Sequence, residues 1–144
     1  MTKDVLIQFS SMQSSAGGTE DTIVDKTESV IRGTYYKKNE NHYLIYDEMM
    51  EGFKEPVKTR VKFGLGFLDI VRSGPVNVRM IFEENKKTTT SYNTPYGNIL
   101  LGINTKKVSI LDAQDEIELS TDYSLTAENE HLSDCSITLT VTRT

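Results

Sequence analysis

The fold of this chain is decided by residues 72–110, which read RSGPVNVRMIFEENKKTTTSYNTPYGNILLGINTKKVSI. Alternating apolar and polar residues predict strands at 76–84, 87–94 and 98–111, because successive side chains of a strand point to opposite faces. The connections between them, Asn85-Lys86 and Pro95-Tyr96-Gly97, are typical turn sequences. Connections this short permit only antiparallel neighbours, since a parallel partner needs a crossover of a dozen or more residues. The stretch therefore predicts three consecutive antiparallel strands.

The same alternation continues in both directions. Upstream it predicts strands at 3–12, 20–38, 42–49, 57–63 and 67–73, and downstream at 116–125 and 134–142. Several of these have a clear inward face; it is formed by Val5, Ile7 and Phe9 in the first strand and by Val57, Thr59, Val61 and Phe63 in 57–63. Both faces of 42–49 carry apolar residues, so its inward face stays open. Gly33 and a change of phase near Asn104 each predict a bulge or bend.

About ten strands with short connections and no convincing helix indicate an all-β meander. An open sheet with one apolar face would leave that face in water and two edges unpaired. Closure removes both problems, so we predict an antiparallel up-and-down β-barrel of about 8–10 strands, with a β-sandwich as the alternative. Residues 1–144 are predicted to form one domain.

Composition limits the classes of function. The chain is 37% hydrophobic and 26% charged, as globular domains are, and has a net charge of −5 from 16 basic and 21 acidic residues. This balance argues against nucleic-acid binding, which depends on clustered Lys and Arg. One cysteine cannot form an intrachain disulfide. We find neither a signal peptide nor an apolar run long enough for a membrane span, and we expect a cytoplasmic protein without membrane partners.

Several motifs resemble a known family. They are the run around Tyr92-Asn93-Thr94-Pro95-Tyr96-Gly97, the upstream Arg32-Gly33-Thr34-Tyr35-Tyr36 and the downstream Glu130-His131-Leu132. Together they resemble the YwiB-like family of small bacterial proteins, a domain of unknown function, over nearly the whole chain. The resemblance implies a calycin-like β-barrel, related in shape to lipocalins. It implies no activity and provides no catalytic residues. The Gly-x-Trp motif of lipocalins is absent, because the chain has no Trp.

Arg72 is the most informative polar residue. It has the parity of Leu68 and Ile70, so it faces inward if they do. A buried guanidinium without a partner would cost several kcal/mol. Two interpretations follow: a structural ion pair, or an anchor for a ligand carboxylate or phosphate.

Four tyrosines are the other candidate ligand-binding residues. Tyr92 and Tyr96 flank Thr94-Pro95, where they either cap the end of the barrel or form an aromatic rim at a cavity mouth. Tyr35 and Tyr123 have the same two interpretations, with a core role favoured.

We predict no catalytic residue, metal site or cofactor. His42 and His131 lack the spacing of metal ligands and are predicted to lie in surface loops. Cys135 is expected to be a buried structural thiol, and the acidic residues Glu116, Glu118 and Asp122 to face solvent.

Two functions stay open. The first is a barrel that binds a small apolar or anionic ligand, oriented by Arg72 and one or more tyrosines. The second is a non-enzymatic interaction or structural module, a homodimer included, with a filled barrel. The residues that would fill it are Phe9, Phe63, Met80, Phe82 and Tyr123. An enzyme would need Arg72, a histidine and a carboxylate to converge.

Overall fold

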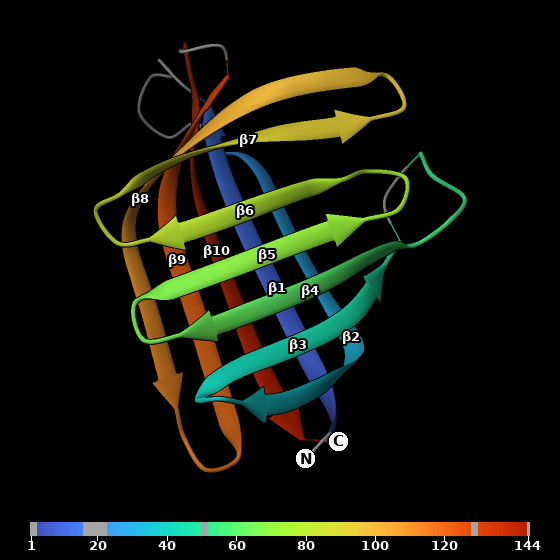
Figure 1. Cartoon of the computed structure of the whole chain (residues 1–144), viewed down its shortest axis with the longest axis vertical. Helices are drawn as coiled ribbons and strands as arrows, with labels where there is room; N and C mark the ends of the chain where they lie inside the picture. Colours follow the sequence, from blue (N-terminus) through green and yellow to red (C-terminus); the bar gives the residue numbers. More distant parts are fainter. Residues whose placement is uncertain (1–2, 16–22, 50–51, 128–129, 144) are drawn as a thin grey trace.

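The computed structural model describes residues 3–15, 23–49, 52–127 and 130–143, with the side chains of 15, 23–25 and 131 excepted. The described residues contain ten strands and no helix (Figure 1). The strands are β1 (Lys3–Ser15), β2 (Ile23–Lys38), β3 (Asn41–Glu48), β4 (Val57–Gly64), β5 (Phe67–Ser73), β6 (Val78–Glu83), β7 (Lys87–Thr94), β8 (Gly97–Asp112), β9 (Glu116–Ala127) and β10 (Glu130–Arg143).

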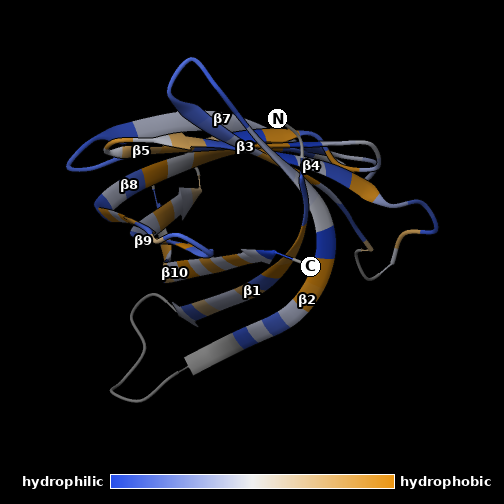
Figure 2. Ribbon diagram, turned by 90° about the horizontal axis from the view of Figure 1, so that it is seen from below, coloured by the Kyte–Doolittle hydropathy of each residue, from blue (hydrophilic) through white to orange (hydrophobic). Residues whose placement is uncertain are grey.

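The ten strands form one sheet that nearly closes into a barrel. Their order is β6-β5-β4-β3-β2-β1-β10-β9-β8-β7, and the paired neighbours are antiparallel. The end strands β6 and β7 meet through a bridge between Asn77 and Asn93 and a hydrogen bond of 2.9 Å from Thr88 Oγ1 to the Ile81 carbonyl. Figure 2 shows the strands curving around one interior. The predicted antiparallel barrel is therefore confirmed, rather than the sandwich.

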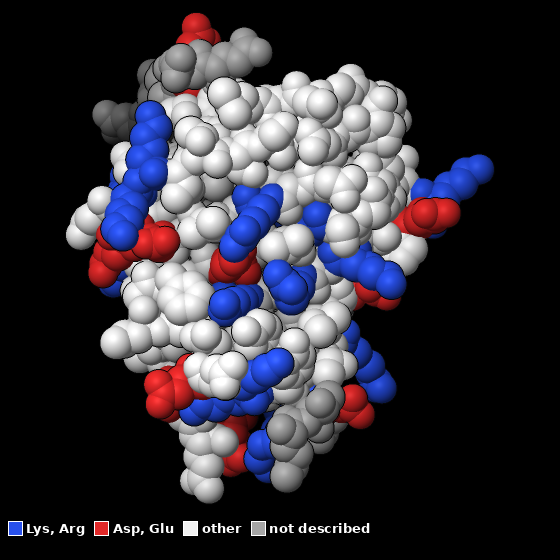
Figure 3. Space-filling view, in the orientation of Figure 1, with Lys and Arg blue, Asp and Glu red and all other residues white. Residues whose placement is uncertain are grey.

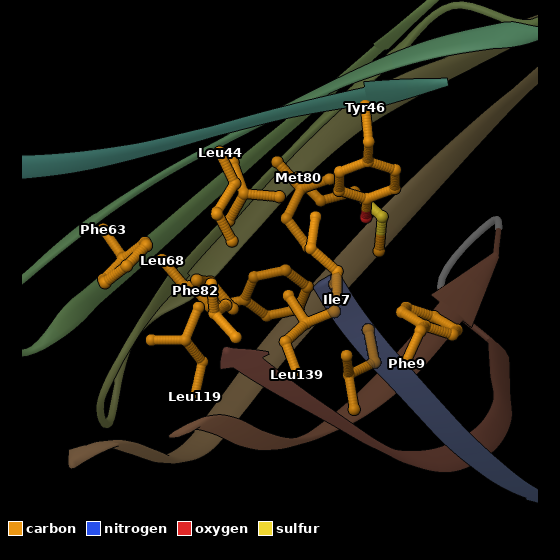
Figure 4. Packing of buried hydrophobic residues seen from close by; sticks show 14 of the residues in the cluster. Ile7, Phe9, Leu44, Tyr46, Phe63, Leu68, Met80, Phe82, Leu119 and Leu139 are labelled. Atoms are coloured by element: carbon orange, nitrogen blue, oxygen red, sulfur yellow. The ribbon is translucent and has the colours of Figure 1, made fainter. Parts of the chain in front are cut away.

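The interior is packed with apolar side chains. The predicted inward faces of β1 and β4 are confirmed, and β3 turns His42, Leu44 and Tyr46 inward. In Figure 4, Leu44 and Tyr46 point toward Ile7 and Leu139 from the opposite wall. The five residues expected in a filled barrel are all buried in one cluster: Phe9, Phe63, Met80, Phe82 and Tyr123.

Of the bulge or bend predicted at Gly33, the bulge is wrong. No bulge occurs there, because the register of β2 against β1 runs unbroken through the pair Val5–Gly33. The glycine instead allows close packing: a Cβ would lie 2.7 Å from Ile7 Cδ1 and 2.9 Å from the Ile45 carbonyl oxygen. Among the described residues, β3 pairs with β2 only from Thr34 onward, so Gly33 marks the point where the two strands separate.

Other boundaries differ from the predictions in detail. The register shift of β8 lies between Thr105 and Lys107, close to the bulge predicted near Asn104. Two further shifts, between Gln13 and Ser14 of β1 and between His131 and Ser133 of β10, were not predicted. Residues 20–22 of the predicted strand 20–38 lie outside the described residues.

The outer face mixes charges of both signs. Figure 3 shows Lys and Arg beside Asp and Glu over the front strands β3–β6, with an uncharged area above them. Glu116, Glu118 and Asp122 of β9 are exposed, as predicted. No helix within the described ranges is long and apolar enough to cross a membrane.

Candidate functional site

The candidate site is a polar row on the inner face of the front strands. The register places Tyr46, Thr59, Arg72 and Val78 side by side on β3, β4, β5 and β6. Tyr46 and Thr59 are buried, and Glu48 is the next inward residue on β3. The prediction that Arg72 shares the face of the buried Leu68 and Ile70 is therefore confirmed.

Arg72 meets a protein carboxylate, as the structural interpretation predicted. Its Nε lies 3.4 Å from Glu48 Oε1, and each of these two side chains is 17% exposed. Thr59 Oγ1 donates a hydrogen bond of 2.8 Å to the same Glu48 oxygen. The Arg72 Nε is nevertheless buried without a hydrogen-bond partner among the described residues. A guanidinium has five N–H donors, so this single contact leaves most of them available.

Two buried tyrosines lie within the electrostatic reach of Arg72. Burial raises the pKa of Tyr46, the negative charge of Glu48 raises it further, and Arg72 opposes both effects. Burial also raises the pKa of Tyr123, aided by Cys135, and Arg72 again acts in the opposite direction. Both phenols therefore stay protonated at neutral pH and can donate hydrogen bonds. The row combines one cation, one carboxylate and neutral hydroxyls, which suits recognition of an anion.

A short polar chain continues beside Tyr123. Gln13 Nε2 donates a hydrogen bond of 2.9 Å to Ser133 Oγ, which lies 3.4 Å from Cys135 Sγ. Cys135 is half-buried and packs against the core, so the prediction of a buried structural thiol is confirmed only in part.

The predicted tyrosines separate into different environments. Tyr92 is half-buried against the core, whereas Tyr96 is 87% exposed. They do not form the aromatic rim, which was one of the two interpretations. Tyr92 is a strand residue, and Tyr96 lies in the turn, where its N–H donates to Thr94 Oγ1. Tyr35 packs against the core at the other end of the front strands. Among the predicted tyrosines, Tyr123 lies close enough to Arg72 for the positive charge to oppose the rise in its pKa.

The prediction that His42 lies in a surface loop is wrong. His42 is buried in β3, its Nδ1 lies 2.6 Å from the Tyr35 hydroxyl, and its ring stacks on Phe63 at 4.7 Å. Hairpin pairing of β2 with β3 turns the ring inward, which residue spacing alone did not indicate. His42 pairs with Phe63 at the opposite end of β3–β5 from Arg72. His131 lies in β10, and its side chain is outside the described residues.

Two cavities lie near other predicted residues. One, of about 260 Å³, lies between β1, β9 and β10 and includes Tyr123 and Cys135 in its wall. The other, of about 160 Å³, lies at the β8–β9 turn and includes Tyr35. Neither is lined by Arg72. The described part of the chain has no group of three His, Cys, Asp or Glu residues arranged to hold a metal ion.

Sequence reasoning missed Glu48 and Tyr46 as neighbours of Arg72. Their signal was their shared parity on 42–49, but the other parity is equally apolar. Thr59 was predicted to face inward, and it does.

Comparison with known proteins gives a consistent result. Residues 7–139 match the model of the family described as "Domain of unknown function (DUF1934)". The chain is 34% identical over 108 residues to the "Uncharacterized beta-barrel protein YwiB" of Bacillus subtilis (strain 168), covering 74% of this chain and 75% of that protein. It also resembles the crystal structure of ywiB protein from Bacillus subtilis, with a TM-score of 0.79 and 25% identity over 96% of this chain and 91% of the other.

Proposed function

This chain belongs to the DUF1934 family of unknown function, and we propose that it is a binding barrel for a small anionic ligand. The observation that carries the proposal is Arg72, a largely buried cation with one carboxylate contact and a buried Nε that lacks a hydrogen-bond partner in the described residues. An arginine held this way can donate two parallel hydrogen bonds to a carboxylate or phosphate. The binding role involves no catalysis.

The surroundings of Arg72 favour an anion over an apolar ligand. The apolar cluster already fills the interior, so an apolar guest would have to displace packed side chains. The row around Arg72 instead offers the hydroxyl of Tyr46, whereas the Thr59 hydroxyl already donates to Glu48.

Glu48 is expected to compete with the ligand. Its carboxylate occupies one side of the guanidinium, so an incoming anion must share or replace it. Glu48→Gln keeps an acceptor for Thr59 and removes the competing charge. Anion affinity should then rise about fivefold, as expected for losing one unfavourable charge interaction of about 1 kcal/mol.

Two measurements test the proposal. Native mass spectrometry of protein purified from its own host should reveal a retained small molecule that Arg72→Met loses. Arg79→Met, which changes an outward arginine, should retain it. Titration with inorganic phosphate should shift the NMR signal of the Arg72 Nε–H, and at lower concentration in Glu48→Gln. No retained molecule together with no response to phosphate in either protein would overturn the proposal.

A further inference from the structure

The outer edge of β2 is open for much of its length. β2 pairs with β1 from Ile23 to Tyr35 but with β3 only from Thr34 to Lys38. Between residues 26 and 32 the side away from β1 therefore has no paired strand in the described structure, and Figure 2 shows β2 sweeping away from β3. Such an edge presents unpaired N–H and C=O groups, which form a template for another strand.

The side chains along this edge are exposed, and they include an aliphatic one. Lys26 and Glu28 are exposed and form an ion pair of 3.1 Å with each other. Val30, two residues further on the same face, is 67% exposed. Charges on an edge ordinarily discourage pairing. Here the two charges, Lys26 and Glu28, have opposite signs. A neighbouring strand that presents an acidic residue opposite Lys26 and a basic residue opposite Glu28 would therefore be attracted.

We infer that a second copy of this chain adds to the edge, with the two β2 strands antiparallel and Thr27 opposite Thr27. In this register Lys26 of each copy stands opposite Glu28 of the other, so the four charges form two opposite pairs on the outer face. The contact is isologous, as a twofold dimer requires. It is independent of the proposed ligand site.

Other twofold registers are less favourable. Two antiparallel strands related by a twofold axis keep their outer faces on one side, so residues of equal parity must face each other. Centring the pair on Lys26 or Glu28 puts like charges opposite. Centring it on Ser29 puts Lys26 opposite Arg32. Centring it on Val30 pairs Glu28 with Arg32, but runs the second strand into Thr34, where β3 already occupies the edge.

Charge reversal tests both the dimer and its register. Sedimentation velocity over a micromolar concentration series should show wild-type dimers. Lys26→Glu and Glu28→Lys should each weaken dimerisation about tenfold, because both cross-strand attractions become repulsions. The double variant should restore it. Circular dichroism and thermal unfolding of each variant confirm that the barrel remains folded.

Mixing the two single variants is the decisive measurement. One copy then presents two acidic side chains and the other two basic ones, so a heterodimer should form that neither variant gives alone. A change in folding within one chain cannot produce this rescue. A wild-type protein that stays monomeric, a Lys26→Glu variant that dimerises like wild type, or a mixture without heterodimer would each overturn the inference.

Discussion

Two arginines on neighbouring strands, Arg72 on β5 and Arg79 on β6, meet carboxylates in different ways. On the outer face, Arg79 donates two hydrogen bonds to Asp69. Its Nε lies 3.2 Å from one carboxylate oxygen, and a terminal nitrogen lies 2.9 Å from the other. On the inner face, Arg72 makes one contact of 3.4 Å with Glu48, outside hydrogen-bond geometry. The better-bonded pair is thus the one whose arginine is 61% exposed. Burial of an arginine therefore does not by itself indicate that its hydrogen bonds to a carboxylate are complete.

Strand separation explains the difference. Asp69 and Arg79 lie on paired strands, one diagonal step apart, because Arg79 stands opposite Val71. Glu48 and Arg72 lie on β3 and β5, which are separated by β4. Neighbouring strands are about 4.8 Å apart, so this pair spans about twice that distance. Arg72 must therefore reach across Thr59, which itself bonds to Glu48.

Among the substitutions that test this difference, one at Glu48 should have the largest effect on stability. Glu48→Ala leaves the Arg72 charge without a carboxylate and the Thr59 hydroxyl without its acceptor. We expect a loss of about 2–3 kcal/mol in the free energy of unfolding, below the 3–5 kcal/mol of a fully buried pair because both side chains keep some solvent contact. Urea unfolding followed by tyrosine fluorescence measures this, since the chain has seven Tyr and no Trp.

The double variant Glu48→Ala, Arg72→Met is the control. Replacing both partners by apolar groups is often nearly neutral, so stability should return to within about 1 kcal/mol of wild type. If the double variant were as unstable as Glu48→Ala, the loss would come from packing around residue 48 and not from the orphaned charge.

Replacing each arginine in turn should cost less stability than Glu48→Ala. Arg79→Ala removes two charge-assisted hydrogen bonds from the buried Asp69 and should cost about 1–2 kcal/mol, discounted for the exposure of Arg79. Arg72→Met leaves the Glu48 carboxylate without a cation, but Glu48 keeps its hydrogen bond from Thr59 and Met fills much of the space, so we expect a loss of about 1 kcal/mol, less than for Glu48→Ala. Thermal unfolding of both variants in the same buffer ranks them. The reverse ranking would assign Arg72 a structural role.

The sequence predicts one half of the Arg72–Glu48 contact. The parity of Leu68 and Ile70 places Arg72 inward, because a strand has a period of two and both neighbours are apolar. The partner depends on which face of β3 turns inward and on the registers β3–β4 and β4–β5. Those registers arise from packing between strands, and no local pattern in 42–49 distinguishes Leu44 and Tyr46 from Tyr43 and Ile45.

The same dependence on register explains why the predictions for His42 and Gly33 were wrong or incomplete. Asparagine and lysine around 37–41 predict a hairpin, but the Tyr35–His42 bond depends on its exact register, Tyr35 opposite Leu44. Gly33 predicts a backbone irregularity equally well as a site of close approach. Only the position of Ile7 and Ile45 shows that close approach is the reason. The alternation of apolar and polar residues along the chain predicts the barrel. The contacts of a site residue depend instead on the registers between neighbouring strands.

His42 is buried, as Arg72 largely is, and its ring is hydrogen-bonded, as Arg79 is. Burial lowers the pKa of His42 below its usual value of 6.5, and the negative charge of Asp112 opposes only part of that shift. Below pH 6.5 the unfolded chain therefore binds a proton that the folded barrel resists. Stability should fall as the pH drops from 6.5 toward the lowered pKa, by at most about 1.4 kcal/mol per pH unit from this group.

His42→Gln removes the titrating ring, so the difference in unfolding free energy between wild type and variant should shrink or change sign from pH 7.5 to pH 5.5. Subtracting the two proteins cancels the carboxylates that titrate over the same range in both. Urea midpoints at the two pH values provide the measurement. A difference independent of pH would show that the imidazole is hydrated enough to protonate in the folded barrel, and that its bond to Tyr35 does not keep it neutral.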